Sequence, residues 1–338
     1  MDVKELLYKV VDRNNLEKDE MYFMMDKIMK GEMSQAQAGA FLTALRIKGE
    51  TITEIAAAAE AMRDNGTYLK GATDAIDIVG TGGDKSSSIN ISSIASFIIS
   101  AAGVKLAKHG NRSVSSKCGA ADLYEALGVN IKTTPEQAKK IYDEIGMIFL
   151  FAQVYHQAMK NAAPIRKELG YRTIFNILGP LTNPCHADKI LLGSYSKELV
   201  PVIANVAKEV GIKNALIVHG EDGLDEVTLT GKTYMAELRN GVISEFVFDP
   251  KSYGFEYCTL DELVGGDPQV NKDIALKILN NENSKRRDAV VLNAGLAIYI
   301  ATDGISIQKG IDIAKEVLAS GKALQKLNDY IRVSNQWF

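Results

Sequence analysis

The chain has 338 residues, of which 46% are hydrophobic and 24% are charged, and its formal net charge at pH 7 is −3. This length and composition predict a soluble globular protein with enough apolar residues for one large or two ordinary domains. The slightly negative charge excludes a general attraction to nucleic acids or anionic membranes, so small anionic molecules are the expected partners.

Signals for export, membrane insertion and cysteine chemistry are missing from the sequence. The first residues lack the apolar core of a secretion signal, and no run of about 18 apolar residues occurs, so we expect a cytoplasmic protein. Cys118, Cys185 and Cys258 are odd in number and far apart, which fits neither a disulfide framework nor a CxxC metal site.

The first 70 residues have the pattern of a helical bundle. Apolar residues from Val3 to Val11 recur at helical spacing. Helix starts and ends are marked by two capping boxes, Ser34 with Gln37 and Thr51 with Glu54, and by three glycines, Gly31, Gly49 and Gly66. We predict a helical domain over residues 1–70, joined in space by part of 160–190. The methionine-rich stretch 21–29 is core filler or a partner-helix surface, and we favour core.

From residue 76 the pattern changes to alternating strands and helices. Strands are predicted at 76–79, 104–108, 147–153, 189–196 and 214–219. Helices are predicted at about 91–102, 119–128 and 198–210, after the capping residues of 134–137, and from about 259 onward. Two extended runs around Asn240-Gly241 predict a hairpin at the sheet edge. The fold class is therefore α/β, with a mostly parallel sheet in a domain over 71–338.

Residues 76–93 combine an apolar strand, a glycine loop and a hydroxyl-rich helix start. Glycines let the backbone approach a ligand closely, and serines with the helix N-terminus offer donors to phosphate oxygens. An ordinary strand-to-helix connection is the alternative. The basic segment 108–117 leaves a neighbouring parallel strand at the same sheet end, and its Lys108 and Arg112 favour a ligand with several phosphates over a solvated turn.

Two further segments carry candidate ligands. Asp225 and Glu226 follow the strand that ends at His219, and with the Ser92 hydroxyl they offer the hard oxygen ligands that Mg²⁺ prefers; an acidic surface turn is an equally good interpretation of the spacing. Arg166 follows Pro164 by two residues and presents a fork for a carboxylate, with an ordinary surface arginine as the alternative. The sequence offers no Ser/His/Asp or Cys/His constellation, so we assign no acid–base or nucleophilic catalyst.

Together these segments closely resemble the anthranilate phosphoribosyltransferase family of tryptophan biosynthesis, over essentially the whole chain. The resemblance rests on the glycine loop, on Asn90-Ile-Ser-Ser93, on 108–116, on 164–184 and on Asp225-Glu226. It implies a helical lobe beside an α/β lobe of the nucleoside phosphorylase and phosphoribosyltransferase type. It also implies a homodimer formed through the helical lobe, and phosphoribosyl pyrophosphate bound with Mg²⁺ at the hinge.

The resemblance carries three sets of residues over to this sequence. Phosphoribosyl pyrophosphate would be held by Gly80, Gly83, Asp84, Ser88, Asn90, Ile91, Ser92, Ser93, Lys108, His109, Gly110, Asn111, Arg112, Ser113, Val114, Ser115 and Ser116. Mg²⁺ would contact Ser92, Asp225 and Glu226. Anthranilate would lie beside Gly80, Asn111 and Arg166. The chemistry implied is transfer of a phosphoribosyl group to the amine with release of pyrophosphate.

Four positions depart from the family pattern, and two other functions compete with it. Lys85 replaces a usual glycine, Ile89 a phenylalanine, Ser93 a threonine and Ala120 a serine, so Ala120 removes one possible phosphate donor. These changes bear on affinity rather than on the type of reaction. One alternative is a pyrimidine nucleoside phosphorylase, from which the 108–112 loop and the Arg166 segment differ. The other is a noncatalytic relative that binds a metabolite or nucleic acid, against which the intact Asp225-Glu226 pair and Asn111 argue.

Overall fold

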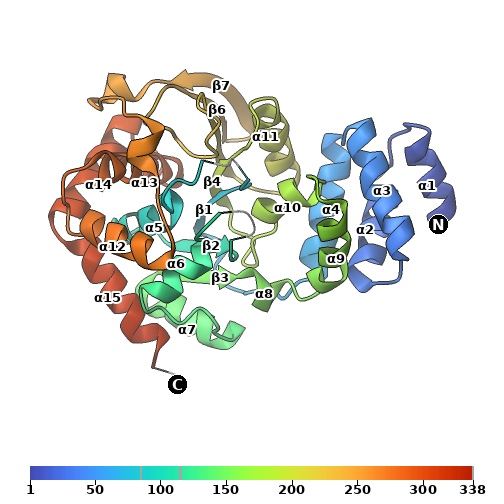
Figure 1. Ribbon diagram of the computed structural model, residues 1–338, viewed down its shortest axis with the longest axis horizontal. Helices are drawn as coiled ribbons and strands as arrows, with labels where there is room; N and C mark the ends of the chain where they lie inside the picture. The colour runs from blue at the N-terminus through green and yellow to red at the C-terminus, as the bar shows by residue number, and fades with distance from the viewer. Residues whose placement is uncertain (84–85, 114–115, 337–338) are drawn as a thin grey trace.

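The computed structural model describes residues 1–83, 86–113 and 116–336, which form a small helical lobe beside a larger α/β lobe (Figure 1). The helical lobe begins with α1 (Val3–Val11), α2 (Lys18–Lys30), α3 (Gln35–Lys48) and α4 (Ile52–Asp64). The capping boxes predicted for α3 and α4 are present, and α2 ends on Gly31 in the left-handed conformation. The methionines of α2 are buried, which confirms that they fill the core.

Helices from the middle of the chain cover the helical lobe. Helix α9 (Met159–Leu169) packs against α2 and α3, while α10 (Phe175–Leu181) and α11 (Leu199–Glu209) pack against α4. At the end of α4, the Arg63 guanidinium donates to the carbonyls of Leu181 and Val210. One hydrophobic core thus runs from the helical lobe to a face of the sheet. The predicted division at residues 70 and 71, with part of 160–190 beside the first domain, stays a prediction.

Within the described residues, the sheet has seven strands in the order β3-β2-β1-β4-β5-β6-β7. Their bounds are β1 Ile76–Gly80, β2 Leu106–Gly110, β3 Met147–Phe151, β4 Lys189–Gly193, β5 Asn214–Gly220, β6 Thr233–Arg239 and β7 Val242–Phe248. Strands β1 to β5 are parallel, and the β6–β7 hairpin adds two antiparallel strands at one edge. The predicted hairpin and α/β class are confirmed.

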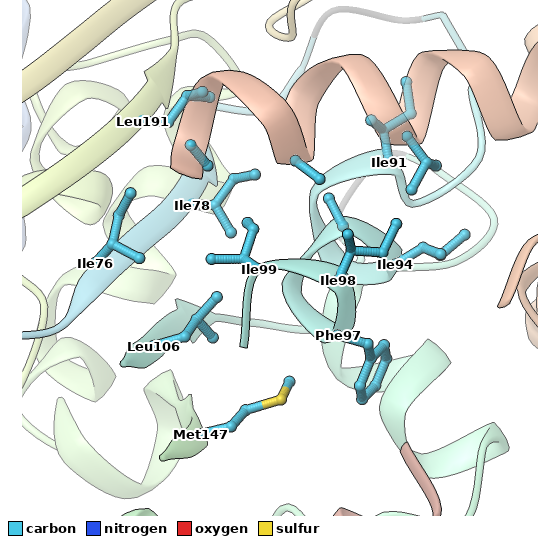
Figure 2. Close-up of a cluster of buried hydrophobic side chains, with 14 of the residues drawn as sticks. Ile76, Ile78, Ile91, Ile94, Phe97, Ile98, Ile99, Leu106, Met147 and Leu191 are labelled. Atoms are coloured by element: carbon cyan, nitrogen blue, oxygen red, sulfur yellow. The ribbon is translucent and has the colours of Figure 1, made fainter. Parts of the chain in front are cut away.

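The larger core lies between the sheet and a layer of helices. Figure 2 shows Ile99 of α5 (Ile91–Ala101) between the strand residues Ile78 and Leu106. Helix α13 (Lys285–Ala301) packs on α5 and on the central strands, and α14 (Ile307–Ala319) and α15 (Lys322–Ser334) continue this layer. Because both faces of the sheet are covered, strands such as β3 and β4 are nearly continuous apolar runs.

The remaining elements are short helices that connect the strands or lie over their ends. They are α6 (Ala120–Ala126), α7 (Pro135–Ile145), α8 (Ala152–Tyr155), α12 (Pro268–Leu279) and the 3₁₀ turns Pro250–Tyr253 and Leu260–Leu263. No helix of the described chain is long and apolar enough to cross a membrane.

Three of the predicted strands have wrong ends. The strand predicted at 104–108 lies two residues later, at Leu106–Gly110, where Leu106 is paired with Ile76 of β1. The strand predicted to reach residue 153 ends at Phe151, because Ala152 accepts a hydrogen bond from the backbone of His156 and starts α8. The strand predicted to reach residue 196 ends at Gly193, because the Ser194 hydroxyl accepts from the backbone of Ser196 and turns the chain.

Candidate active site

The strand order reverses between β1 and β4, because β2 and β3 follow on one side and β5 on the other. In a parallel sheet such a switch leaves a crevice at the carboxyl ends of the strands, where ligands bind. Gly80 and Gly193, the last residues of β1 and β4, are paired there in register. The predicted glycine loop begins at Gly80, and β2 ends next to β1 at Gly110.

Asp225 occupies the crevice between these two strand ends. A Cβ atom at Gly193 would lie 1.6 Å from the Asp225 carbonyl oxygen, and one at Gly80 would lie 2.3 Å from Asp225 Oδ2. The same Oδ2 accepts a hydrogen bond of 2.6 Å from the backbone of Gly82. Both strands must therefore end in glycine for this carboxylate to reach the glycine loop.

Ser92, Glu226 and Lys108 meet beside Asp225. The backbone N–H of Ser92, in the first turn of α5, donates to Glu226 Oε1 at 3.3 Å, and Lys108 Nζ donates to Ser92 Oγ at 3.2 Å. Lys108 also donates to the carbonyl of Ile78 and is 2% exposed. Burial lowers its pKa, and the carboxylates of the site oppose that shift.

The oxygen atoms brought together here fit a magnesium ion. Two carboxylates and one hydroxyl are the hard donors that Mg²⁺ takes from a protein, and phosphate oxygens of a substrate complete such sites. The described residues contain no group of three or more His, Cys, Asp or Glu that would hold a metal alone. The predicted trio of Ser92, Asp225 and Glu226 is thus brought to one place, with a donor set that suits Mg²⁺.

Asp77 lies beneath the site and was missed by the sequence analysis. It is fully buried on β1 and accepts hydrogen bonds from the backbone of His109 at 3.1 Å and from Asn183 Nδ2 at 2.8 Å. Burial raises its pKa to about 6. The sequence shows only that one carboxylate interrupts the apolar run 76–79. It does not show the partner of Asp77, because Asn183 is 106 residues away along the chain.

The far side of the glycine loop is tied to the C-terminal helices. The backbone N–H groups of Gly265 and Ile89 donate to the carbonyls of Ser87 and Leu263, each at 2.9 Å. Asn271 of α12 donates to Asn90 Oδ1 at 2.9 Å, just before α5 begins. Asn271 was another residue that the sequence analysis missed, because nothing local marks its partner.

Arg112 points toward α6 rather than into the crevice. Its guanidinium pairs with Glu125 at 2.5 and 2.9 Å and with Asp122 at 2.8 Å, and these contacts raise its pKa. Asp122 also accepts a hydrogen bond of 3.1 Å from the backbone of Ser113, so the same carboxylate holds the backbone of the basic loop that follows β2. The sequence predicted Arg112 as a cation for phosphate, and the structure gives it two carboxylate partners.

Arg166 lies on α9, with its guanidinium 5.4 Å from the centre of the Phe175 ring. Burial lowers its pKa, and no carboxylate of the described chain forms an ion pair with it. No hydrogen bond or ion pair within the described ranges joins it to Gly80 or Asn111. A guanidinium that is partly desolvated and lacks a carboxylate partner is suited to an anionic ligand.

Two buried histidines, His109 on β2 and His156, pack against each other with their ring centres 5.0 Å apart and their ring planes at 54°. His109 Nδ1 contacts the Gly179 carbonyl at 3.2 Å, and His156 Nε2 contacts the Thr182 carbonyl at 2.8 Å. Their other ring nitrogens are buried and have no partner among the described residues. Burial lowers both pKa values, that of His156 to about 4, so both rings are neutral at pH 7.

The remaining predicted residues lie on the same loops and helix start. Ser88 precedes α5, Ile91 and Ser93 are buried in its first turn, and Asn111 Oδ1 accepts from the backbone of Arg112 at 2.8 Å. The Ser113 and Ser116 hydroxyls are 2.9 Å apart. Outside the described residues lie Asp84, Lys85, Val114 and Ser115.

Comparison with known proteins agrees with this geometry. Residues 4–66 match the helical bundle domain of the glycosyl transferase family, and residues 72–324 match its a/b domain. The anthranilate phosphoribosyltransferase of Endomicrobium trichonymphae is 50% identical over 334 residues, which cover 99% of both chains. The chain belongs to the anthranilate phosphoribosyltransferase family.

Solved structures of the family superimpose on nearly the whole chain. The enzyme from Thermus thermophilus is 41% identical, with a TM-score of 0.93 over 97% of this chain and 99% of that one. The Saccharomyces cerevisiae enzyme in complex with PRPP and Mg is 29% identical, with a TM-score of 0.90 over 98% and 97%. The yeast enzyme is also known in complex with 4-fluoroanthranilate, with a TM-score of 0.88 and the same coverage. The resemblance to this family and the fold class are confirmed.

Proposed function

We propose that the protein transfers the 5-phosphoribosyl group of phosphoribosyl pyrophosphate to the amine of anthranilate, in tryptophan biosynthesis. The products are N-(5-phosphoribosyl)anthranilate and pyrophosphate. The observation that carries this proposal is the meeting of Ser92, Asp225 and Glu226 below the glycine loop, at the switch point of the sheet. Family membership supports it, as do the relatives solved with PRPP and Mg and with a substituted anthranilate.

Phosphoribosyl pyrophosphate binds along the carboxyl ends of β1 and β2 in this proposal. The N-terminus of α5 and the glycine loop supply backbone donors, which favour anionic oxygens. Lys108 is buried below α5, so its charge acts on the site through Ser92 and through the neighbouring carboxylates. The Arg112 side chain pairs with Asp122 and Glu125 on α6 but keeps 37% of its surface exposed, so in this proposal it would turn away from α6 to reach the phosphates.

Ser92, Asp225 and Glu226 would hold Mg²⁺ together with phosphate oxygens of the substrate. When bound, the ion neutralises the negative charge that develops on the departing pyrophosphate. Asp225 also accepts a hydrogen bond from the backbone of Gly82, so this carboxylate links the proposed ion site to the glycine loop.

The reaction breaks the bond between ribose C1 and pyrophosphate oxygen and forms a bond from C1 to the anthranilate nitrogen, which then loses a proton. The developing charge on the leaving oxygens is stabilised by Lys108, Arg112 and loop N–H groups. A neutral aromatic amine is already a nucleophile, so the remaining contribution is its position near C1. We therefore assign no residue as a strong base.

Arg166 binds the anthranilate carboxylate in this proposal, and Gly80 and Asn111 would border the same substrate. Its guanidinium forms no ion pair within the part of the chain that the structure describes, which supports this role, because an ion pair with a ligand offsets the cost of its partial burial.

We also propose a cytoplasmic homodimer formed through the helical lobe, with no nucleic-acid partner. Tyr8 and Val11 on α1 and Ile47 on α3 support the dimer surface, because they leave 71%, 55% and 63% of their surfaces exposed.

A substrate panel tests the assignment. Purified protein should consume anthranilate only with phosphoribosyl pyrophosphate, and it should not phosphorolyse thymidine or uridine. Phosphorolysis of either nucleoside would replace the proposal with the phosphorylase alternative, and binding without turnover of any pair would indicate a noncatalytic relative.

A further inference from the structure

Arg172 contacts the glycine loop from the segment that follows α9. Its guanidinium donates to the carbonyl of Gly83, and the group lies 3.9 Å from the centre of the Tyr195 ring. A Cβ atom at Gly83 would lie only 3.2 Å from Arg172 Nη2. The arginine is therefore packed closely against the loop backbone on one side and against an aromatic ring on another.

The rest of the glycine loop is anchored within the α/β lobe. Thr81 donates its N–H to the Gly193 carbonyl at 2.9 Å, and its hydroxyl accepts from the backbone of Tyr195 at 3.0 Å. Gly82 is held by Asp225 at 2.6 Å. Arg172 thus holds the next peptide of the loop, and Tyr195 contacts both Thr81 and this arginine.

The same segment is bound to the helical lobe by α3. The Arg46 guanidinium donates to the Arg172 carbonyl, and it lies 5.3 Å from the centre of the Tyr171 ring. The hydroxyl of Tyr171 is hydrogen-bonded to Thr43 Oγ1, one turn earlier on α3. Two neighbouring residues, Tyr171 and Arg172, therefore connect the first lobe of the chain to the glycine loop of the second.

The charge of Arg172 adds to this geometry. Within the described ranges Arg172 forms no ion pair with a carboxylate, unlike Arg112. Its positive charge therefore lies beside the glycine loop, hydrogen-bonded to the neutral carbonyl of Gly83. A charged donor makes a stronger hydrogen bond than a neutral one, and contact with the Tyr195 ring holds the guanidinium plane.

We propose that Arg172 is a positioning residue for phosphoribosyl pyrophosphate: it fixes the glycine loop and ties its position to helix α3. This inference rests on the proposed function, because the loop must bind that substrate. Arg172 reaches the substrate through the backbone of Gly83, whereas Arg166 is assigned to anthranilate. The two arginines, six residues apart, therefore act on different substrates.

Steady-state kinetics of matched variants test the inference. In Arg172→Ala, the KM for phosphoribosyl pyrophosphate should rise about 10- to 100-fold, the loss expected for a charge-assisted hydrogen bond, while the KM for anthranilate changes by less than about threefold. Arg172→Lys keeps the charge and a donor and should recover most of the loss, and Arg172→Gln should not. Arg46→Ala should give a smaller effect in the same direction.

Hydrogen–deuterium exchange without any substrate gives a readout independent of activity. The backbone amides of 80–83 should exchange faster in Arg172→Ala than in the wild type. Arg332→Ala, which removes an exposed arginine on α15, should match the wild type in both assays. If Arg172→Ala does not fold, Tyr195→Leu removes the ring under the guanidinium and should raise the same KM.

The outcomes separate this inference from the proposed function. Unchanged exchange and an unchanged KM for phosphoribosyl pyrophosphate would overturn the role of Arg172. Equal increases in the KM values for phosphoribosyl pyrophosphate and for anthranilate, without recovery in Arg172→Lys, would also overturn it. Arg172 would then have only a general structural role. Absence of turnover in the wild type would instead refute the proposed function, while faster loop exchange in Arg172→Ala would still establish the contact.

Discussion

Asp225 reaches the glycine loop because two adjacent strands end without a side chain. Its carbonyl fills the space where a Cβ of Gly193 would stand, and its carboxylate fills the corresponding space at Gly80. Because glycine has no Cβ, Gly80 and Gly193 leave the space that this proposed magnesium ligand occupies. Small substitutions at these strand ends act directly on that ligand.

Gly80→Ala should abolish most activity, because the new Cβ would lie 2.3 Å from Asp225 Oδ2 and must displace it. We expect kcat/KM to fall at least about 100-fold, with a weaker apparent affinity for Mg²⁺. Magnesium titration of initial rates measures both. Gly39→Ala on α3 is the control, since among the described residues its Cβ would meet only Leu169 Cδ2, at the ordinary contact distance of 3.9 Å. Retained activity in Gly80→Ala would show that Asp225 is not needed there.

Arg166→Ala should raise the KM for anthranilate about 10- to 100-fold and leave that for phosphoribosyl pyrophosphate nearly unchanged. The physical reason is the loss of the only partner proposed for the anthranilate carboxylate. Initial rates with each substrate varied at saturation of the other give both constants. Similar increases in the two constants would contradict the assignment of Arg166.

His156 should make folding sensitive to acid. Its folded pKa of about 4 lies below the ordinary value of 6.5, so the stability it contributes is present above pH 6.5 and is lost as the pH falls toward 4. Between pH 7 and pH 5, the wild type should lose about 2 kcal/mol of unfolding free energy relative to His156→Gln. Urea unfolding at both pH values measures this difference, and parallel losses in the two proteins would show that His156 is not the cause.

At the scale of elements, local signals predicted helices better than strand ends. Capping boxes at the starts of α3, α4 and α7 were visible in the sequence because both partners lie three residues apart. The ends of β3 and β4 were not visible, because apolar residues continue into α8 in one case and a serine turn follows in the other. Strand ends depend on contacts with other segments, which periodicity does not report.

The same distinction between local signals and contacts with distant segments applies to the candidate site. The residues of the glycine loop, the basic loop and the Asp225-Glu226 pair could be predicted because each follows a strand of a parallel sheet. Asp77, Asn183 and Asn271 could not, since each forms a side-chain hydrogen bond to a residue 106 or 181 positions away in sequence. The pairing of Arg112 with α6 was also missed, because a cation near acidic residues does not reveal which partner it takes.

At the scale of the whole molecule, the two lobes are joined by a common hydrophobic core and by hydrogen bonds between them. One core extends from α1 through α4 to the face of the sheet covered by α10 and α11. Contacts of Arg63 and of the Tyr171–Arg172 segment cross between the lobes. The strand order, and with it the switch point, could not be predicted from the sequence, because five parallel strands are compatible with several orders.

The proposed dimer makes a prediction for the helical lobe. Ile47→Glu should give a monomer, because a charge on an exposed apolar residue of α3 is costly to bury at an interface. Val242→Glu, at the equally exposed edge strand β7, is the matched control and should stay dimeric. Light scattering after size exclusion measures the mass of each variant. A wild type that elutes as a monomer would contradict the dimer.

The most direct test of the proposed reaction follows anthranilate fluorescence in the presence of phosphoribosyl pyrophosphate and Mg²⁺, with pyrophosphate measured in parallel. We predict loss of fluorescence with one pyrophosphate released per anthranilate consumed, and arrest of both when a chelator is added. Folded protein that releases no pyrophosphate, or that releases it without consuming anthranilate, would contradict phosphoribosyl transfer to anthranilate at this site.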